Sequence, residues 1–164
     1  MVLEVRKFGD PVLKSRATVV KEFDDTLHRL AEDMLQTMRE HEGVGLAANQ
    51  VGRLKRILVA AVEDEEFAIV NPVVSSSSEE RQLGPEGCLS IPGIQVDVER
   101  PTAITLTGLN LEGEPMQLEA EGLIARIFQH EIDHLDGVLI LDRTDRASRK
   151  EAMRELRERL IAQS

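Results

Sequence analysis

Two histidines and a glutamate form the pattern in this sequence that most directly suggests chemistry. They lie in the segment His130-Glu131-Ile132-Asp133-His134. On a helix, side chains four residues apart share one face, so both imidazoles could bind one metal ion beside the carboxylate. The pattern predicts a metal site with Glu131 as the catalytic acid and base, although such a match also arises by chance in acidic helices.

A third metal ligand has to come from another part of the chain. Zinc peptidases with this motif take it from a downstream histidine or glutamate, but no histidine follows His134. Glu151 and Glu155 lie among arginines, where exposed ion pairing is expected. The stronger candidate is Cys88, the only cysteine. Its thiolate would complete a Cys-His-His site whose fourth position is open, which is typical of catalytic sites.

Hydrophobic periodicity indicates the elements that position these residues. Apolar residues at three- and four-residue steps predict an amphipathic helix from Asp24 to about His41. The loop 43–50, rich in small residues, follows it, and the serine-rich segment 75–80 predicts an exposed turn or flexible loop. Strand-like segments are expected at 56–62, 67–74, 103–109 and 116–120, the last two forming a hairpin.

A second helix is expected over 121–136, with Gly137 as its stop. Its core stripe would be Ile124, Phe128, Ile132 and Leu135. A last helix should begin near Ser148, which has capping-box spacing to Glu151, with Met153, Leu156 and Leu160 as its apolar face. This order predicts a mixed α+β fold, with largely antiparallel sheets around a central HExxH helix and with a long N-terminal and a C-terminal helix.

Length and composition narrow the class of protein. The 164 residues fit one domain, 1–164, with 41% apolar and 30% charged residues. No secretory signal and no membrane-length apolar run is visible, so we expect a cytoplasmic chain without membrane contact. The net charge of −10 and the absence of tryptophan and tyrosine argue against sequence-specific nucleic-acid binding.

Three segments resemble the signature motifs of peptide deformylases, in the family's order and spacing. They are GVGLAANQ at 43–50, EGCLS at 86–90 and HEIDH at 130–134. The first motif more often has proline where this chain has Asn49. The resemblance implies hydrolytic removal of the N-formyl group from the initiator formyl-methionine of newly synthesised polypeptides. The rival interpretations are an HExxH zinc peptidase and a non-catalytic structural metal site.

The resemblance also implies roles for individual residues. The metal, Fe(II) in the family with zinc, nickel or cobalt able to replace it, would be bound by Cys88, His130 and His134. Glu131 would take a proton from water and return it to the leaving amine. The Gln50 side-chain amide and the Leu89 backbone N–H would stabilise the developing oxyanion.

A pocket for the methionine side chain is expected beside the metal. On a helical projection, Leu123, Arg126 and Ile127 lie on or beside the face of His130 and His134. We expect the substrate-binding residues to be Val44, Gly45, Leu123, Arg126 and Ile127. Ordinary core packing is the alternative for Leu123 and Ile127, and a plain turn is the alternative for the glycine.

Two further hypotheses concern charged residues. Glu86 and Asp133, next to the metal ligands, could support them with Arg100 as a charge partner. The helix over 146–159 has an excess of basic residues in an acidic chain. It resembles the family's C-terminal helix, so it could dock on ribosomal RNA, although such a run is usually a solvated helix face.

Overall fold

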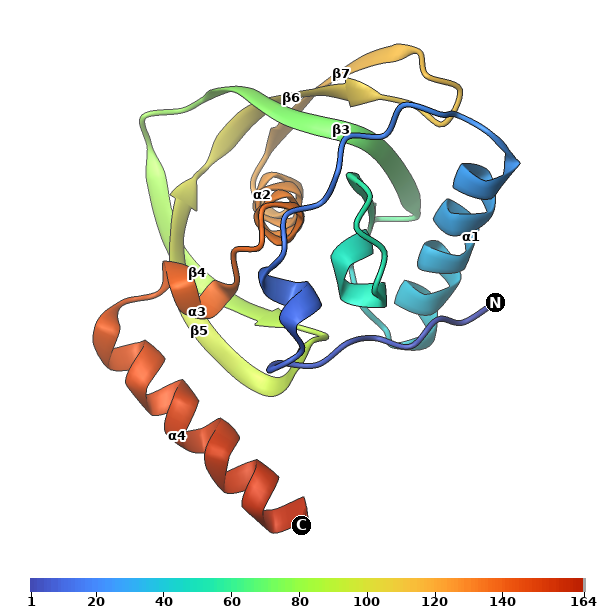
Figure 1. Cartoon of the computed structure of the whole chain (residues 1–164). Helices are drawn as coiled ribbons and strands as arrows, with labels where there is room; N and C mark the ends of the chain where they lie inside the picture. Colours follow the sequence, from blue (N-terminus) through green and yellow to red (C-terminus); the bar gives the residue numbers. More distant parts are fainter. Residues whose placement is uncertain (164) are drawn as a thin grey trace.

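Two antiparallel sheets enclose one central helix, α2. The computed structural model describes residues 1–163, so Ser164 of the expected domain lies outside the described part. A five-stranded sheet has the order β1-β2-β3-β6-β7, and β4 and β5 form a separate hairpin. In Figure 1, α2 is seen nearly end-on between the two sheets. The strands are β1 Gly45–Ala47, β2 Ile57–Val62, β3 Glu65–Ser77, β4 Arg81–Cys88, β5 Ile91–Pro101, β6 Ala103–Leu109 and β7 Pro115–Glu121.

Helix α1, Asp25–Glu40, confirms the first predicted helix. The Asp24 side chain accepts a hydrogen bond from the Leu27 backbone N–H at 3.1 Å and caps the helix. The buried face, which packs against the residues of β2, comprises Leu27, Leu30, Ala31, Met34, Thr37 and Met38. After α1, β1 and the short 3-10 helix η2, Ala48–Val51, form the small-residue loop.

The serine-rich segment was only partly predicted. Ser75–Ser77 belong to β3, where Ser76 pairs with Thr105 and Ser77 with Ile104. The expected loop is therefore wrong for these serines, because ladder pairing with β6 outweighs their local turn preference. The hairpin of β4 and β5 was not predicted at all. Its first strand contains Gly84, Pro85 and Gly87, residues that are depleted in strands.

Helix α2, Leu123–Leu135, carries the HEIDH segment. Gly122, the N-cap of the helix, has a φ of 68°, and Gly137 beyond its end has a φ of 75°, a conformation that favours glycine. Phe128 is buried and meets Phe67 of β3 edge to face, with ring centroids 5.4 Å apart. The helix is buried on most of its circumference, which fixes its rotation and the direction of its histidines.

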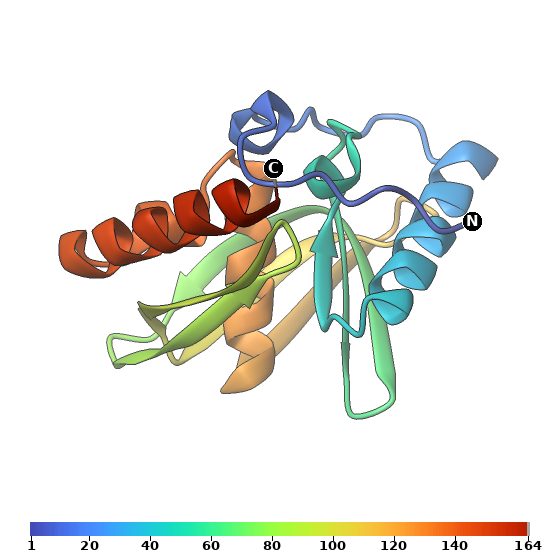
Figure 2. The same cartoon turned by 90° about the horizontal axis from the view of Figure 1, so that it is seen from below.

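The C-terminal part was predicted less well. A short helix α3, Ile140–Arg143, precedes α4, Arg146–Gln163. Helix α4 begins before Ser148 because Asp145 accepts hydrogen bonds from the Ser148 backbone N–H at 2.7 Å and from its hydroxyl at 3.0 Å. Figure 2 shows α4 lying along the hairpin. Ala152, Met153 and Leu156 pack onto β5, but Leu160 is 66% exposed and does not belong to the buried face.

Within residues 1–163, no helix is long and apolar enough to span a membrane.

Candidate active site

The three expected metal ligands converge at the meeting point of β4 and α2. Cys88 ends β4, and His130 and His134 lie one turn apart on α2. Their ligand atoms all lie within 4.8 Å of one another. His134 Nε2 is 3.3 Å from Cys88 Sγ and 3.2 Å from His130 Nε2. Tetrahedral coordination puts such donors about 3.4 to 3.6 Å apart, so the residues fit a divalent ion.

The electrostatics of the cluster favour the ligand form of the cysteine. Burial by itself would raise the pKa of the Cys88 thiol, but the adjacent His134 and His130 outweigh it and hold the pKa well below its usual value. The thiolate is the form that binds metals. A thiolate with two imidazoles is a donor set that suits several transition metals.

Glu131 lies beside the Cys88, His130 and His134 cluster, and one of its carboxylate oxygens has no hydrogen-bond partner among the described residues. Its Oε2 is 3.9 Å from His130 Nε2, and the oxygen without a partner is the buried Oε1. Burial raises the pKa of Glu131, even though the neighbouring histidines oppose the shift. A raised pKa brings a carboxylate closer to the range in which it can both accept and return a proton.

Gln50 directs its side-chain amide at the cluster. Its Oε1 accepts a hydrogen bond from the Ala47 N–H at 3.0 Å, which leaves the NH₂ group facing Cys88 Sγ at 3.4 Å and Ser90 Oγ at 3.2 Å. The neighbouring Asn49, the departure from the resembled motif, points away and donates to the Ser15 carbonyl at 2.8 Å. Asn49 therefore ties the loop to the N-terminal segment without entering the site.

A cavity of about 630 Å³ opens above the cluster. Ile127 is buried in its wall, whereas Val44 and Leu123 lie at its rim and are 51% and 62% exposed. All the predicted site residues except His134 line it: Val44, Gly45, Gln50, Cys88, Leu89, Leu123, Arg126, Ile127, His130 and Glu131. Sequence reasoning missed Lys7, His41, Glu42, Pro92, Gly93 and Gln95, which also line it. They lie outside the three motifs and carry no spacing signal.

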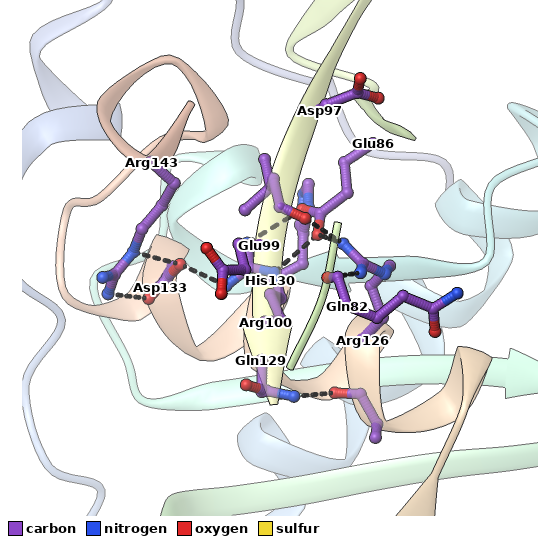
Figure 3. Close-up of polar contacts among 12 residues, drawn as sticks. Gln82, Glu86, Asp97, Glu99, Arg100, Arg126, Gln129, His130, Asp133 and Arg143 are labelled. Atoms are coloured by element: carbon purple, nitrogen blue, oxygen red, sulfur yellow. Dashed lines mark hydrogen bonds and ion pairs between the residues drawn. The ribbon is translucent and has the colours of Figure 1, made fainter. Parts of the chain in front are cut away.

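A buried ionic network supports His130 from behind (Figure 3). Glu86 Oε1 is 3.0 Å from His130 Nδ1, and Arg100 binds both Glu86 oxygens, at 2.6 and 2.9 Å. Burial would raise the pKa of Glu86, but hydrogen bonds from His130 and Arg100 lower it to about 2. Because an ionised carboxylate only accepts hydrogen bonds, the Nδ1 atom of His130 carries the proton that faces Glu86. In the neutral imidazole, Nε2 is then the nitrogen available to bind a metal.

The network continues along α2 to Asp133, which follows His130 by about one turn. Arg100 Nη1 donates to Asp133 Oδ2 at 2.9 Å, and Arg143 of α3 donates to both Asp133 oxygens, at 3.0 and 2.9 Å. Glu86, Asp133 and Arg100 are therefore brought together as the sequence suggested, while Arg143 was not anticipated. The network fixes α2 against β4 and β5 next to the metal ligands.

The arrangement allows hydrolysis assisted by a metal, since an open cavity gives a substrate access to a ligand cluster beside the buried carboxylate of Glu131. The α+β fold and this site together define a metallohydrolase. Residues 2–150 match the family described as polypeptide deformylase. The chain belongs to this family, and it is a metal-dependent hydrolase that removes the N-formyl group from nascent polypeptides.

Individual relatives agree with this assignment. The chain is 48% identical to a peptide deformylase of Natranaerobius thermophilus over 92% of this chain and 97% of that protein. The structure of peptide deformylase from Thermus thermophilus superposes with a TM-score of 0.92 at 42% identity, covering 98% of this chain and 96% of that one. The structure of peptide deformylase from Synechococcus elongatus in complex with actinonin superposes with a TM-score of 0.90 at 41% identity, covering 93% of this chain and 85% of that one.

Proposed function

We propose that deformylation takes place at the Cys88, His130 and His134 cluster, with Glu131 as the general base and acid. The observation that carries this proposal is the placement of the unpartnered Glu131 Oε1 beside three converging metal ligands on an open cavity. A purely structural metal site would not need the open cavity that Cys88, His130 and Glu131 line.

The metal that we propose is Fe(II), on the resemblance to the family, with zinc, nickel or cobalt able to occupy the same donors. The donor set does not select among these ions. When bound, such an ion polarises the formyl carbonyl and lowers the pKa of water at the site.

Glu131 is proposed to move the proton. Its buried carboxylate takes a proton from the attacking water and delivers it to the amine that leaves when the formyl C–N bond breaks. The raised pKa of Glu131 helps the carboxyl group to hold this proton between the two transfers. The Glu131 carboxylate lies close to Gly45, one of the residues expected to bind the substrate.

The oxyanion is proposed to be bound by Gln50 and Leu89. The Gln50 NH₂ group already faces Cys88, where the reacting carbonyl must come. Leu89 follows Cys88 directly, so its backbone N–H is delivered by the same turn. Each such donor contributes about 3 kcal/mol to stabilisation of the transition state.

The peptide is proposed to add to the free edge of β1. This strand is at the end of the five-stranded sheet. The Val44 carbonyl accepts from the Ala61 N–H at 2.9 Å, so in an antiparallel ladder the N–H and carbonyl of Gly45 point the other way, toward the cavity. An extended peptide can pair there, and its methionine side chain would contact Ile127, Leu123 and Val44.

Neither rival interpretation has a comparable observation in its favour. The glutamates that a zinc peptidase would use as a third ligand lie on α4, where Glu151 accepts from Arg154 at 2.5 Å and Glu155 from Arg159 at 3.3 Å. A structural site would leave the cavity, the Gln50 amide and Glu131 without a role.

We further propose a cytoplasmic location and docking of α4 on the ribosome. Lys150 and Arg157 are exposed basic residues of this helix. Reversing both charges (Lys150→Glu with Arg157→Glu) should weaken co-sedimentation with ribosomes at low salt. Unchanged co-sedimentation would eliminate this docking mode.

The proposed chemistry is tested by formate release from formyl-Met-Ala-Ser. Protein purified anaerobically and loaded with Fe(II) or Ni(II) should release formate, and the Glu131→Ala variant should not. Release that persists in the variant would exclude Glu131 as the proton carrier, while no release by metal-loaded wild-type protein would exclude the reaction at this site.

A further inference from the structure

Arg126 on α2 directs its guanidinium at the hairpin and makes three hydrogen bonds to it. Its Nη1 donates to Glu86 Oε2 at 2.6 Å and to the Val98 carbonyl at 2.9 Å, and its Nη2 donates to the Gln82 carbonyl at 2.8 Å. These acceptors lie on both hairpin strands, so one side chain of α2 holds β4 and β5 (Figure 3). The sequence predicted Arg126 only as one of the substrate-binding residues.

The backbone of β4 leaves room for this contact. A Cβ atom at Gly84 would lie 3.2 Å from Arg126 Nη2 and 3.3 Å from Cζ, closer than most real contacts of this kind. Gly84 therefore lets the planar guanidinium lie close against the strand. The side chain of Arg126 is 16% exposed. Its hydrogen bonds to Glu86 and to the Val98 carbonyl are partly buried, whereas its bond to the Gln82 carbonyl is exposed.

The acceptor that matters is Glu86, because it is the partner of His130. Arg100 also binds the Glu86 carboxylate, but it approaches from β5. Arg126 approaches from the same helix as His130 and lies one turn before it. The Glu86 carboxylate is thus held between the guanidiniums of Arg100 and Arg126. Arg126 is on the same helix as His130, the imidazole that Glu86 orients.

We propose that Arg126 is a positioning residue that fixes the His130 imidazole through Glu86. This inference rests on the proposed metal ligands, and it assigns the Arg126 guanidinium to the support of His130, while Arg126 also lines the cavity. Loss of the guanidinium should leave Glu86 with one clamp and let the carboxylate and the imidazole rotate together. Partners of this kind typically change metal affinity by 10- to 100-fold.

The test compares Arg126→Met with Gln129→Met in the full chain. The first variant keeps a long, unbranched side chain at this position but removes all three hydrogen bonds. The second is a matched control on the same helix, because Gln129 Nε2 donates to the Pro101 carbonyl at the end of β5 at 3.1 Å without touching Glu86. Co(II) affinity from chelator competition, the Co(II) absorption spectrum, the melting temperature, kcat and KM are measured for each.

Arg126→Met should bind Co(II) roughly 10- to 100-fold more weakly and shift its ligand-field bands, with kcat reduced more than KM is raised. Gln129→Met should lower only the melting temperature. Arg126→Lys should fall between wild type and Arg126→Met, since an ammonium cannot reproduce the planar fork. Wild-type Co(II) affinity and spectrum in Arg126→Met, or equal changes in Gln129→Met, would overturn the proposal.

A double variant shows whether the effect passes through Glu86. If it does, the fold-loss of Co(II) affinity in the double variant Glu86→Gln with Arg126→Met should be smaller than the product of the fold-losses in the two single variants. A full product would mean that Arg126 acts by another route. If the proposed metal site is itself wrong, wild-type protein should bind Co(II) without the charge-transfer band of a thiolate ligand. This result would be distinct from a failure of the Arg126 proposal alone.

Discussion

Replacing Gly45 with alanine should separate catalysis from metal binding. The added Cβ would lie 2.6 Å from Glu131 Oε2, 3.1 Å from its Cδ and 2.9 Å from Ile127 Cγ2. Gly45 is not among the glycines with positive φ, so the backbone itself accepts alanine. The strain therefore falls on the Glu131 carboxylate and on Ile127.

The size of the effect follows from the overlap. A comfortable carbon–oxygen contact is about 3.3 Å, so the carboxylate has to withdraw by about 0.7 Å. A displacement of about 1 Å at a reacting group can reduce a rate by about 100-fold. We expect Gly45→Ala to lower kcat by roughly 10- to 100-fold, while Cys88, His130 and His134 retain their metal.

The assay is formate release from formyl-Met-Ala-Ser together with Co(II) affinity. Gly43→Ala is the milder comparison, because its Cβ would meet the end of the Leu89 side chain, at 3.0 Å, and not Glu131. A kcat for Gly45→Ala within twofold of wild type, at full metal loading, would refute the view that Glu131 must stay where it is. Loss of the metal would show instead that the steric effect spreads to the ligands.

Three other changes test separate parts of the site and fold. Gln50→Ala should lower kcat by roughly 100- to 1,000-fold with the metal retained, and a near-normal kcat would remove Gln50 from oxyanion binding. Ile127→Ala should weaken the preference for formyl-Met over formyl-Ala peptides by roughly 10-fold, measured as the ratio of kcat/KM values, and an unchanged ratio would place the methionine elsewhere. Asp142 has a lowered pKa, since hydrogen bonds from Lys14 and the Leu139 N–H outweigh the opposing effect of burial. The stabilisation that Asp142 contributes is present above its unfolded pKa of about 3.8 and is lost as the pH falls through the lower folded value. Asp142→Asn should therefore reduce the melting temperature more at pH 7 than at pH 3. An equal reduction at both pH values would contradict the ion pair.

The parts of the structure that the sequence predicted well are those set by local rules. The Asp24 cap and the apolar steps of α1 act within one helix, and the HEIDH spacing fixes two imidazoles on one face of α2. The Cys88 ligand was suggested by elimination and by motif resemblance. Its proximity to His134 is a tertiary contact, which only the folded chain shows.

The parts that were missed depend on contacts between distant segments. The hairpin strand of Gly84 and Pro85 is stable because β5 pairs with it and α4 covers β5, not because of its own propensity. The guanidinium of Arg126 could not be assigned from a helical projection, since its three acceptors lie on strands whose existence was not predicted.

The hairpin also has a consequence for the order of folding. Strands β3 and β6 pair although the whole hairpin lies between them in the chain, whereas β1, β2 and β3 pair as sequence neighbours. Pairing β3 with β6 requires closure of the chain segment between them, which costs conformational entropy before the strand contacts form. Strand pairs between sequence neighbours should therefore form first. Because Cys88 and His134 are 46 residues apart and come from hairpin and helix, refolding protein should acquire its secondary structure before it can capture a metal ion.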